Sequence, residues 1–315
     1  MPFSPFLTSD QAGSSSRRDR TSPNVLRLPA TKTQSERSED NMYSLTDKVV
    51  VITGGANGIG AAIAEEVLKN APKHVRLLDI NEKSGQQIAN ELNDKYGADK
   101  VKFVTCDVTN DDELFGALED TKAEHDYIDV VFNNAGVANE SNYAAIRKQV
   151  EINLTALMHG TYKAIELMDK TKGGRGGAVM NTASIAGLYP ICPALPVYAA
   201  TKSAVVQFTR SIGADSNLAN SGVRILALCI GVTHTNILEN LYTFEDKGAE
   251  QVKAAFSPFM ETMQSAEAAA RGSIEAYKKG KSATVWLIHK SKPAINVFED
   301  KDTWGVEVAQ LLGED

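Results

Sequence analysis

The sequence predicts an α/β fold: a single doubly wound domain in which helices cover both faces of a parallel sheet of seven strands. Short β-branched runs alternate with longer amphipathic stretches from Lys48 onward, which is typical of βαβ units. The runs are apolar at successive positions, as expected for strands that are buried on both faces. A glycine-rich turn joins the first run to the first amphipathic stretch, so we expect a ligand site at the carboxyl ends of the strands.

The β-branched runs place the expected strands in order along the chain, and the amphipathic stretches between them place the helices. We expect strands at residues 49–53, 74–80, 101–106, 130–132, 178–181, 224–230 and 284–288. We expect helices at about residues 58–70, 84–96, 111–124, 142–170, 198–219 and 264–279. Residues that carry chemistry should therefore follow the ends of these strands.

The composition limits the class of partner. Of the 315 residues, 33 are Lys or Arg and 40 are Asp or Glu, which gives a net charge of −7, and 43% are hydrophobic. An acidic chain gains no counterion-release affinity for a phosphate backbone, so we expect no nucleic-acid partner. The longest apolar stretches fall far short of the roughly 18 residues that a membrane span needs. We therefore expect a protein without a membrane span that acts on a small molecule.

Cysteine and histidine usage argues against a metal site. Cys106, Cys192 and Cys229 are far apart, form no CxxC pair and have apolar or small neighbours. They are interpreted as reduced core thiols, which favours the cytoplasm. The five histidines show no ligand spacing with each other or with cysteine. We expect no bound metal.

The N-terminal residues 1–40 differ in composition from the rest of the chain. They contain eight serines and four of the ten prolines, with almost no periodic apolar pattern. We expect a disordered tail at 1–40 and one catalytic domain at 41–315, the last part of which covers the substrate. Six basic residues in the tail leave a mitochondrial transit peptide open as an alternative, although five acidic residues argue against one.

The glycine-rich turn runs from Thr53 to Gly60 and opens directly into a helix. Glycines let the backbone approach an anion, and the free N–H groups of a helix start point toward it. The spacing is Gly54, Gly58, Gly60 rather than GxGxxG, and no Gly-Lys-Ser/Thr follows, which excludes a Walker loop. The turn therefore predicts a site for a pyrophosphate.

Asp79 ends the second strand, 79 − 60 = 19 residues after Gly60. A carboxylate at this position can accept both ribose hydroxyls of an adenosine, and it repels a 2′-phosphate. Neither the turn nor the two residues after Asp79 offer a Lys or Arg for such a phosphate. NAD is therefore favoured over NADP.

A Tyr four residues before a Lys places both side chains on one helical face, where the ammonium can stabilise a phenolate. The chain has three such pairs: Tyr96/Lys100, Tyr198/Lys202 and Tyr277/Lys281. Glycines at 97 and 280 interrupt the first and third pairs. Only Tyr198/Lys202 lies on a continuous helical pattern, shortly after the strand that Ser184 follows.

These motifs, taken together, resemble the short-chain dehydrogenase/reductase family, whose members have a Rossmann domain, over nearly all of residues 45–290. TGxxxGxG stands at 53–60, Asp-Val at 107–108 and NNAG at 133–136. The resemblance implies that Asn153, Ser184, Tyr198 and Lys202 are catalytic. It implies a cofactor site made by Gly54, Asn57, Gly58, Ile59, Gly60, Asp79, Asp107, Val108, Asn134, Ala135, Gly136, Tyr198, Lys202, Gly231, Val232 and Thr235.

The implied reaction moves a hydride between an alcohol and NAD, with Tyr198 as general acid/base. A phenol of pKa about 10 needs a drop of roughly 2 to 3 units, or about 3 to 4 kcal/mol, to act as a base near neutrality. Lys202 and the positive nicotinamide ring can supply that charge. Ser184 would hold the substrate oxygen, and Asn153 would carry a water that relays protons. The resemblance also implies a homodimer or homotetramer formed through helices at 151–169 and 198–218.

Within the family, the segments 172–177, 196–198 and 207–210 are most similar to insect-type alcohol dehydrogenases and to NAD-dependent 15-hydroxyprostaglandin dehydrogenase, and 281–286 and 304–305 to the insect type. Ile230 stands where the family has Pro, although Thr235 keeps the place of the amide-binding Thr. The loop from 184 to 198 is apolar and has no Gln for a prostaglandin hydroxyl. We therefore expect a lipophilic primary or secondary alcohol as substrate. A prostaglandin dehydrogenase, an NADP-dependent carbonyl reductase and an NAD-binding protein without turnover are the alternatives.

Overall fold

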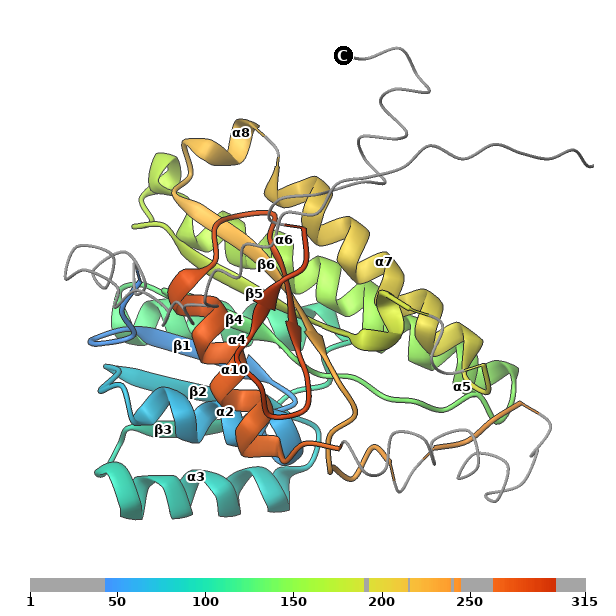
Figure 1. Cartoon of the computed structure of the whole chain (residues 1–315). Coiled ribbons are helices and arrows are strands. Elements are labelled where there is room, and N and C mark those ends of the chain that lie inside the picture. Colours follow the sequence, from blue (N-terminus) through green and yellow to red (C-terminus); the bar gives the residue numbers. More distant parts are fainter. Residues whose placement is uncertain (1–42, 190–192, 215, 239–240, 245–262, 299–315) are drawn as a thin grey trace, which may run out of the picture.

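The computed structural model describes residues 43–189, 193–214, 216–238, 241–244 and 263–298 (Figure 1). Its sheet has eight strands in the order β3-β2-β1-β4-β5-β6-β7-β8. Seven strands pair in parallel, as the sequence predicts, and the doubly wound α/β class is confirmed. The prediction of seven strands was wrong by one, because β8 adds an antiparallel strand at the β7 edge.

The strands begin and end close to their predicted positions. They are β1 (Val49–Thr53), β2 (His74–Asp79), β3 (Val101–Thr105), β4 (Val130–Asn133), β5 (Gly177–Ser184), β6 (Val223–Ile230), β7 (Val285–Ile288) and β8 (Ile295–Asn296). The strand order reverses between β1 and β4, because β2 and β3 lie on one side of β1 and the later strands lie on the other. A doubly wound sheet binds its ligand at such a reversal point, outside the carboxyl ends of the strands.

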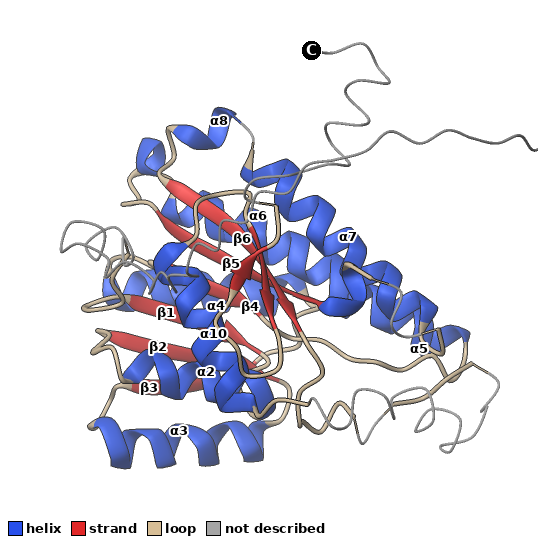
Figure 2. Ribbon diagram, viewed as in Figure 1, coloured by secondary structure: helices blue, strands red, loops and turns tan. Residues whose placement is uncertain are grey.

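Two helical layers cover the sheet, as Figures 1 and 2 show. One layer holds α2 (Gly58–Leu68), α3 (Glu82–Tyr96) and α10 (Ala266–Lys279). The other holds α4 (Asp111–His125), α5 (Tyr143–Val150), α6 (Leu157–Met168) and α7 (Pro196–Gly213). In β1, Val50 and Ile52 belong to the core under α2, and Val51 belongs to the core under α4 and α6. Alternate side chains of one strand thus fill both cores, which explains its continuous apolar sequence.

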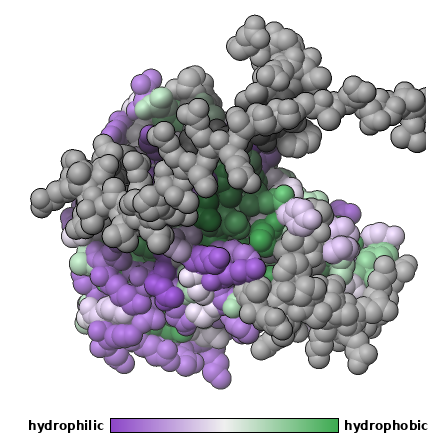
Figure 3. Space-filling model, viewed as in Figure 1, coloured by the Kyte–Doolittle hydropathy of each residue, from purple (hydrophilic) through white to green (hydrophobic). Residues whose placement is uncertain are grey.

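Hydrophilic and hydrophobic residues lie on different parts of the surface. α3 buries only Gly85, Ala89 and Leu92, and hydrophilic residues cover this helix in Figure 3. Hydrophobic residues gather in the middle of the same view, around β6 to β8. There the partly buried Val297 and Phe298, which follow β8, pack on a small core that includes Val285.

The long helix predicted at 142–170 is interrupted. A π-helical segment, η1 (Glu151–Ala156), joins α5 to α6. Such bulges are frequent at functional sites, and this one carries Asn153, which is fully buried. The helix predicted at 198–219 starts two residues earlier, with Pro196 in its first turn, and α7 ends at Gly213 before the short α8 (Ser216–Ala219). Proline is common in the first helical turn because an N–H group there has no hydrogen-bond partner within the helix.

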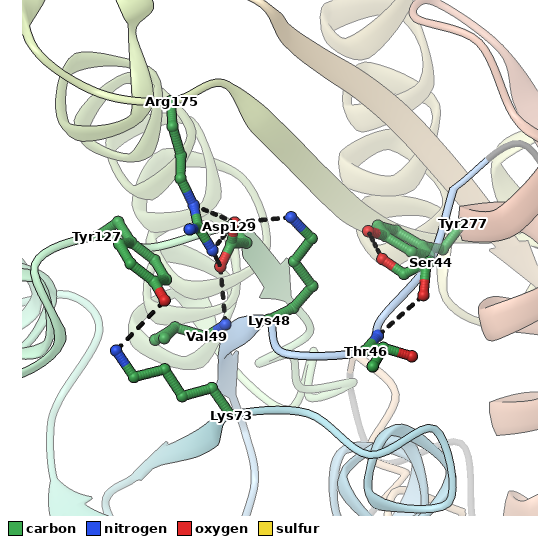
Figure 4. Close-up of polar contacts among 9 residues, drawn as sticks. All are labelled: Ser44, Thr46, Lys48, Val49, Lys73, Tyr127, Asp129, Arg175 and Tyr277. Carbon is green, nitrogen blue, oxygen red and sulfur yellow. Dashed lines mark hydrogen bonds and ion pairs between the residues drawn. The ribbon is translucent and has the colours of Figure 1, made fainter.

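Asp129 ties together the amino ends of three strands (Figure 4). Its buried carboxylate accepts the Val49 N–H at 2.8 Å, two N–H groups of Arg175 at 2.8 Å each and the Lys48 ammonium at 3.2 Å. The Arg175 guanidinium also lies 3.1 Å from the centroid of the Tyr127 ring. A hollow of about 780 Å³ adjoins these residues. The hollow lies at the amino ends of the strands, and the Asp129 carboxylate beside it is fully paired. We therefore assign this region a structural role.

His74 and His125 stack beside this end of the sheet, with ring centroids 4.3 Å apart. The His74 Nδ1 atom is 3.1 Å from the Asp99 carbonyl oxygen, and the Nε2 atoms of both rings have no hydrogen-bond partner among the described residues. Burial, together with the charges of His125 and Arg76, lowers the pKa of His74 to about 4. His74 is therefore neutral in the folded protein at neutral pH.

We expect the His74 pair to make the fold sensitive to acid. An unfolded His has a pKa of about 6.5, so below that pH the unfolded chain binds a proton that the folded chain excludes. The stabilisation is complete above this value and is lost as pH falls toward the folded pKa of about 4. At pH 5 the loss, relative to pH values well above 6.5, is about 2 kcal/mol.

Urea unfolding of the wild type and of His74→Gln at several pH values measures this effect. The variant should lose less unfolding free energy on acidification, whereas replacement of the exposed His234 by Gln should leave the wild-type slope. Equal slopes for wild type and His74→Gln would contradict the assignment.

Cys106 and Cys229 are buried free thiols, as expected. Burial raises the pKa of each to about 12. Cys192, the predicted tail at 1–40 and the C-terminal residues 299–315 lie outside the described residues. Within the described ranges, no helix has the length and apolar character of a membrane span, and no group of His, Cys, Asp and Glu could hold a metal ion.

Candidate active site

Two neighbouring cavities open at the carboxyl ends of the strands. The first, of about 280 Å³, is bordered by the glycine turn and the ends of β2 and β3. The second, of about 130 Å³, is bordered by the ends of β5 and β6 and the start of α7. Both are lined by Ile59, Asn134, Gly136, Thr235 and Ile237. A ligand in the first cavity can therefore contact a second ligand in the other.

The glycine turn is shaped to receive an anion. Gly54 and Gly58 have φ values of +67° and +54°, a backbone region that residues other than glycine rarely adopt. A Cβ atom on Gly60 would lie 2.0 Å from the Gly54 carbonyl oxygen, so only glycine lets α2 start so close to the turn. Asn57, the N-cap of α2, makes no side-chain cap, and the first turn of the helix has no acidic residue. The start of α2 can therefore donate its N–H groups to a phosphate.

Hydrogen bonds join this turn to the loop after β4 across the reversal point of the sheet. The Thr53 Oγ1 atom accepts the N–H groups of Asn134 at 3.0 Å and Ala135 at 3.1 Å. In return, the Asn134 Nδ2 atom donates to the Thr53 carbonyl at 3.1 Å. The NNAG segment thus forms one wall of the first cavity and is fixed to the glycine turn.

Asp79 lies at the end of β2 on the rim of the first cavity, as predicted. One carboxylate oxygen accepts the Ala56 N–H at 3.1 Å, and the other accepts the Asn81 N–H at 3.0 Å. These bonds fix the carboxylate beside the glycine turn, where it can accept the hydroxyls of a ribose.

Asp107 and Val108 also line the first cavity. The Asp107 carboxylate accepts the Thr109 N–H at 2.9 Å and its hydroxyl at 2.7 Å, and lies 3.3 Å from the Lys148 ammonium. Burial alone would raise the pKa of Asp107, but the Thr109 hydrogen bonds and Lys148 together hold it below its ordinary value. Lys148, a cavity residue that the sequence analysis missed, is thus neutralised by Asp107.

Ser184, Tyr198 and Lys202 line the second cavity together. The Ser184 hydroxyl accepts the Ala186 N–H at 3.1 Å, so its own proton can still be donated. The Lys202 ammonium donates to the Thr182 carbonyl at 2.9 Å and lies 5.8 Å from the centroid of the Tyr198 ring. Burial lowers the pKa of Lys202 to about 8, so the group is still mainly an ammonium at neutral pH. Its charge favours a phenolate on Tyr198.

Asn153 is close to this group but does not line either cavity. Its amide binds the Val137 backbone in both directions, accepting the N–H and donating to the carbonyl, each at 2.8 Å. A Cβ atom built on Gly136 would lie 3.4 Å from the Asn153 Oδ1 atom and 3.5 Å from the Lys202 Nζ atom. Asn153 and Lys202 therefore both lie close to Gly136.

The segment after β6 borders both cavities. Gly231, Val232 and Thr235 line the second cavity, and the Thr235 methyl group lies 3.3 Å from where Gly58 would carry a Cβ atom. Ile230, which departs from the family's Pro, is buried in β6 and lines the same cavity. The Gly231 N–H donates to the Ile288 carbonyl at 2.8 Å, so the turn remains anchored.

The second cavity also has a polar residue that the motifs did not single out. The Thr182 hydroxyl is buried and has no hydrogen-bond partner among the described residues. It was missed because the sequence offers no sign of which face of β5 points into the cavity. The rest of the lining includes the apolar residues Ala138, Ile185, Leu195, Ile237, Leu238 and Leu241.

Comparisons with known families and proteins agree with this geometry. The family model described as short chain dehydrogenase matches residues 48–246. The chain is 40% identical to human 15-hydroxyprostaglandin dehydrogenase [NAD(+)] over 201 residues, 64% of this chain and 74% of that protein. It is 35% identical to alcohol dehydrogenase 1 of Ceratitis cosyra over 206 residues, 64% of this chain and 77% of that protein.

Solved structures have the same fold. Levodione reductase superposes with a TM-score of 0.67 at 26% identity, over 78% of this chain and 97% of that chain. A 3-ketoacyl-(acyl-carrier-protein) reductase from Brucella melitensis complexed with NADH superposes with a TM-score of 0.67 at 22% identity, over 78% of this chain and 98% of that chain.

Proposed function

The chain belongs to the short chain dehydrogenase family, and on this basis we propose that it is an NAD-dependent alcohol dehydrogenase acting on a lipophilic primary or secondary alcohol. One observation carries the proposal: Ser184, Tyr198 and Lys202 lie on the wall of an apolar cavity that shares five lining residues with the nucleotide cavity. An alcohol in the apolar cavity then meets a proton acceptor on one side and the cofactor on the other.

The first cavity suits NAD. The glycine turn and the uncapped start of α2 can bind the pyrophosphate, and Asp79 can accept the ribose hydroxyls. Relatives whose names specify NAD(+) support this choice. The only cation lining this cavity among the described residues, Lys148, is paired with Asp107 and so is a weak candidate for a 2′-phosphate.

Ser184, Tyr198 and Lys202 in the second cavity, and Asn153 near it, then have defined roles. A bound NAD would supply the acceptor for the hydride of the alcohol carbon. Tyr198 takes the proton of the alcohol hydroxyl, Ser184 donates a hydrogen bond to that oxygen, and the buried Lys202 ammonium stabilises the phenolate and binds the nicotinamide ribose. Asn153 holds Val137 and, with it, the loop that carries Gly136. Proton relay through a water on Asn153 remains part of the proposal.

The apolar lining predicts a rising preference along a series of linear alcohols. Each additional buried methylene contributes about 0.8 kcal/mol, or about a fourfold gain in kcat/KM, until the cavity is filled. Initial rates of NADH formation over short alcohols, farnesol, retinol, a steroid and a prostaglandin measure the ranking. We expect the highest value on a lipophilic alcohol.

A prostaglandin dehydrogenase is the second candidate, because relatives with that name are 40% identical. The absence of Gln among residues 184–198 argues against it, since a buried prostaglandin hydroxyl needs a polar partner. The highest kcat/KM on the prostaglandin in the same panel would overturn our choice of substrate class and leave the chemistry of Tyr198 in place.

The assembly and location remain proposals. Tyr162 on α6 is 59% exposed and packs edge-on against Phe208 of α7 at 5.9 Å, which suits a homodimer or homotetramer formed through these helices. Light scattering of the purified chain tests this. We keep the cytoplasm as the expected compartment, with residues 1–40 as a tail and 41–315 as one catalytic domain.

A further inference from the structure

Glu140, in the loop after β4, is a carboxylate that the proposed reaction leaves without a task. Its side chain is 1% exposed, and no Lys or Arg among the described residues forms an ion pair with it. A buried carboxylate is costly unless hydrogen bonds compensate its charge. The partners that it does have therefore indicate its role.

The first partner is the backbone of the catalytic helix. The Glu140 Oε1 atom accepts the Tyr198 N–H at 2.7 Å. Tyr198 is the third residue of α7, and the N-cap residue Leu195 has no side-chain oxygen to satisfy this group. Glu140 thus caps α7 from another part of the chain, and its negative charge faces the positive end of the helix dipole.

The second partner fixes the carboxylate itself. Gln149 of α5 is fully buried, and its Nε2 atom donates to the Glu140 Oε1 atom at 3.4 Å. The Oε1 atom of Gln149 accepts the Asn139 N–H at 2.7 Å. The Gln149 amide therefore holds the backbone just before Glu140 and donates to its carboxylate. The capping oxygen thus has a defined position.

The third partner belongs to the segment that borders the substrate cavity. The Glu140 N–H donates to the Tyr242 carbonyl at 2.7 Å, and Asn139 pairs with Tyr242 in a parallel bridge. On the cavity side of this pairing, Leu241 and Tyr198 pack on the cluster formed by Ala138 and Leu195. Glu140 is therefore bonded both to the Tyr198 backbone and to the segment that borders the substrate cavity.

We propose that Glu140 is a positioning residue, which fixes Tyr198 relative to the substrate cavity by holding the first turn of α7. It acts through the Tyr198 backbone and does not contact the reacting atoms. The inference rests on the proposed function, in which Tyr198 takes the alcohol proton. It adds Glu140 to the four motif residues that the proposed reaction requires.

The test compares Glu140→Ala, Glu140→Asp and Glu140→Gln with the wild type on the best alcohol of the panel. Loss or withdrawal of the capping oxygen should lower kcat about 30-fold in the Ala variant and about tenfold in the Asp variant. The KM for NAD should stay within about twofold, because the first cavity is untouched. The Gln variant keeps an oxygen for the Tyr198 N–H and should recover kcat to within about threefold of the wild type.

Ser265→Ala is the matched control, because Ser265 caps α10 by accepting the Ala268 N–H at 3.2 Å, away from both cavities. It should lose comparable stability and keep its kcat. Equal kcat for Glu140→Ala or Glu140→Asp and the control, at matched folded fraction, would overturn the inference. So would a Gln variant as slow as Ala. If Ala does not fold, Asp and Gln still decide.

Amide hydrogen exchange separates this inference from the proposed function. The Tyr198 amide should exchange at least about tenfold faster in Glu140→Asp than in the wild type, with the β5 amides unchanged. A wild type that oxidises no alcohol defeats the proposed function, and exchange then tests the capping alone. Unchanged Tyr198 exchange would overturn the inference whatever the activity.

Discussion

Replacing Tyr198 by Phe should lower kcat/KM for alcohol oxidation by about a thousandfold, within the range that a positioned general acid/base contributes. The phenol is the only acid/base group among the described residues that lines the second cavity together with Ser184 and Lys202, apart from Lys202 itself, which is bonded to the Thr182 carbonyl. Phe keeps the ring and its packing against the cluster of Ala138 and Leu195, so the fold and the cavity should survive.

Stopped-flow or steady-state NADH formation measures the loss, and NAD affinity measured by fluorescence should change only a few-fold. Tyr189→Phe provides a control, because Tyr189 is 68% exposed and does not line the cavity. A Tyr198→Phe variant with more than about a tenth of wild-type kcat/KM would remove Tyr198 from the mechanism.

Replacing Asp79 by Ala should shift the kcat/KM ratio of NAD to NADP by about a hundredfold toward NADP. The carboxylate is held by the Ala56 and Asn81 N–H groups, and in the proposed complex it would accept the ribose hydroxyls and repel a 2′-phosphate. Loss of these two effects together should change the free-energy preference for NAD over NADP by about 3 kcal/mol. Because each 1.4 kcal/mol is a factor of ten, the kcat/KM ratio should change by about a hundredfold. The variant should lose NAD activity and gain NADP activity.

Rates with NAD and NADP at equal concentration measure the shift. Asp94→Asn removes the same charge from the exposed face of α3 and should leave the ratio unchanged. A ratio in Asp79→Ala within about threefold of the wild type would show that Asp79 does not choose the cofactor. A wild type that prefers NADP would favour the carbonyl reductase alternative.

The strands and the nucleotide cavity were predictable because local signals determine them. The predicted strands are largely apolar runs, although β2 and β3 carry Arg76 and Lys102. The glycine turn combines four glycines with a strand before it and a helix after it. Gly60 has no alternative, since a Cβ atom there would meet the Gly54 carbonyl. Residues bound to the backbone of such a turn, such as Asp79, take their position from the strand that they end.

The features that were missed depend on pairings between distant segments. β8 has two residues, Ile295 and Asn296, and is a strand only because β7 offers a free edge. The sequence pattern of the π-helix is that of a continuous helix, and the hydrogen bond from Val137 to Asn153 within it joins residues 16 positions apart. The roles of Glu140 and Lys148 arise from contacts 58 and 41 residues away in sequence, which no local pattern contains.

The central claim, that the chain oxidises an alcohol with NAD through Tyr198, is tested most directly by one comparison. NADH formation from a lipophilic alcohol is followed with the wild type and with Tyr198→Phe at equal enzyme concentration. We predict clear formation with the wild type and about a thousandfold less with the variant. If the wild type forms no more NADH than Tyr198→Phe from any alcohol, the claim is contradicted. That result would favour an NAD-binding protein without turnover.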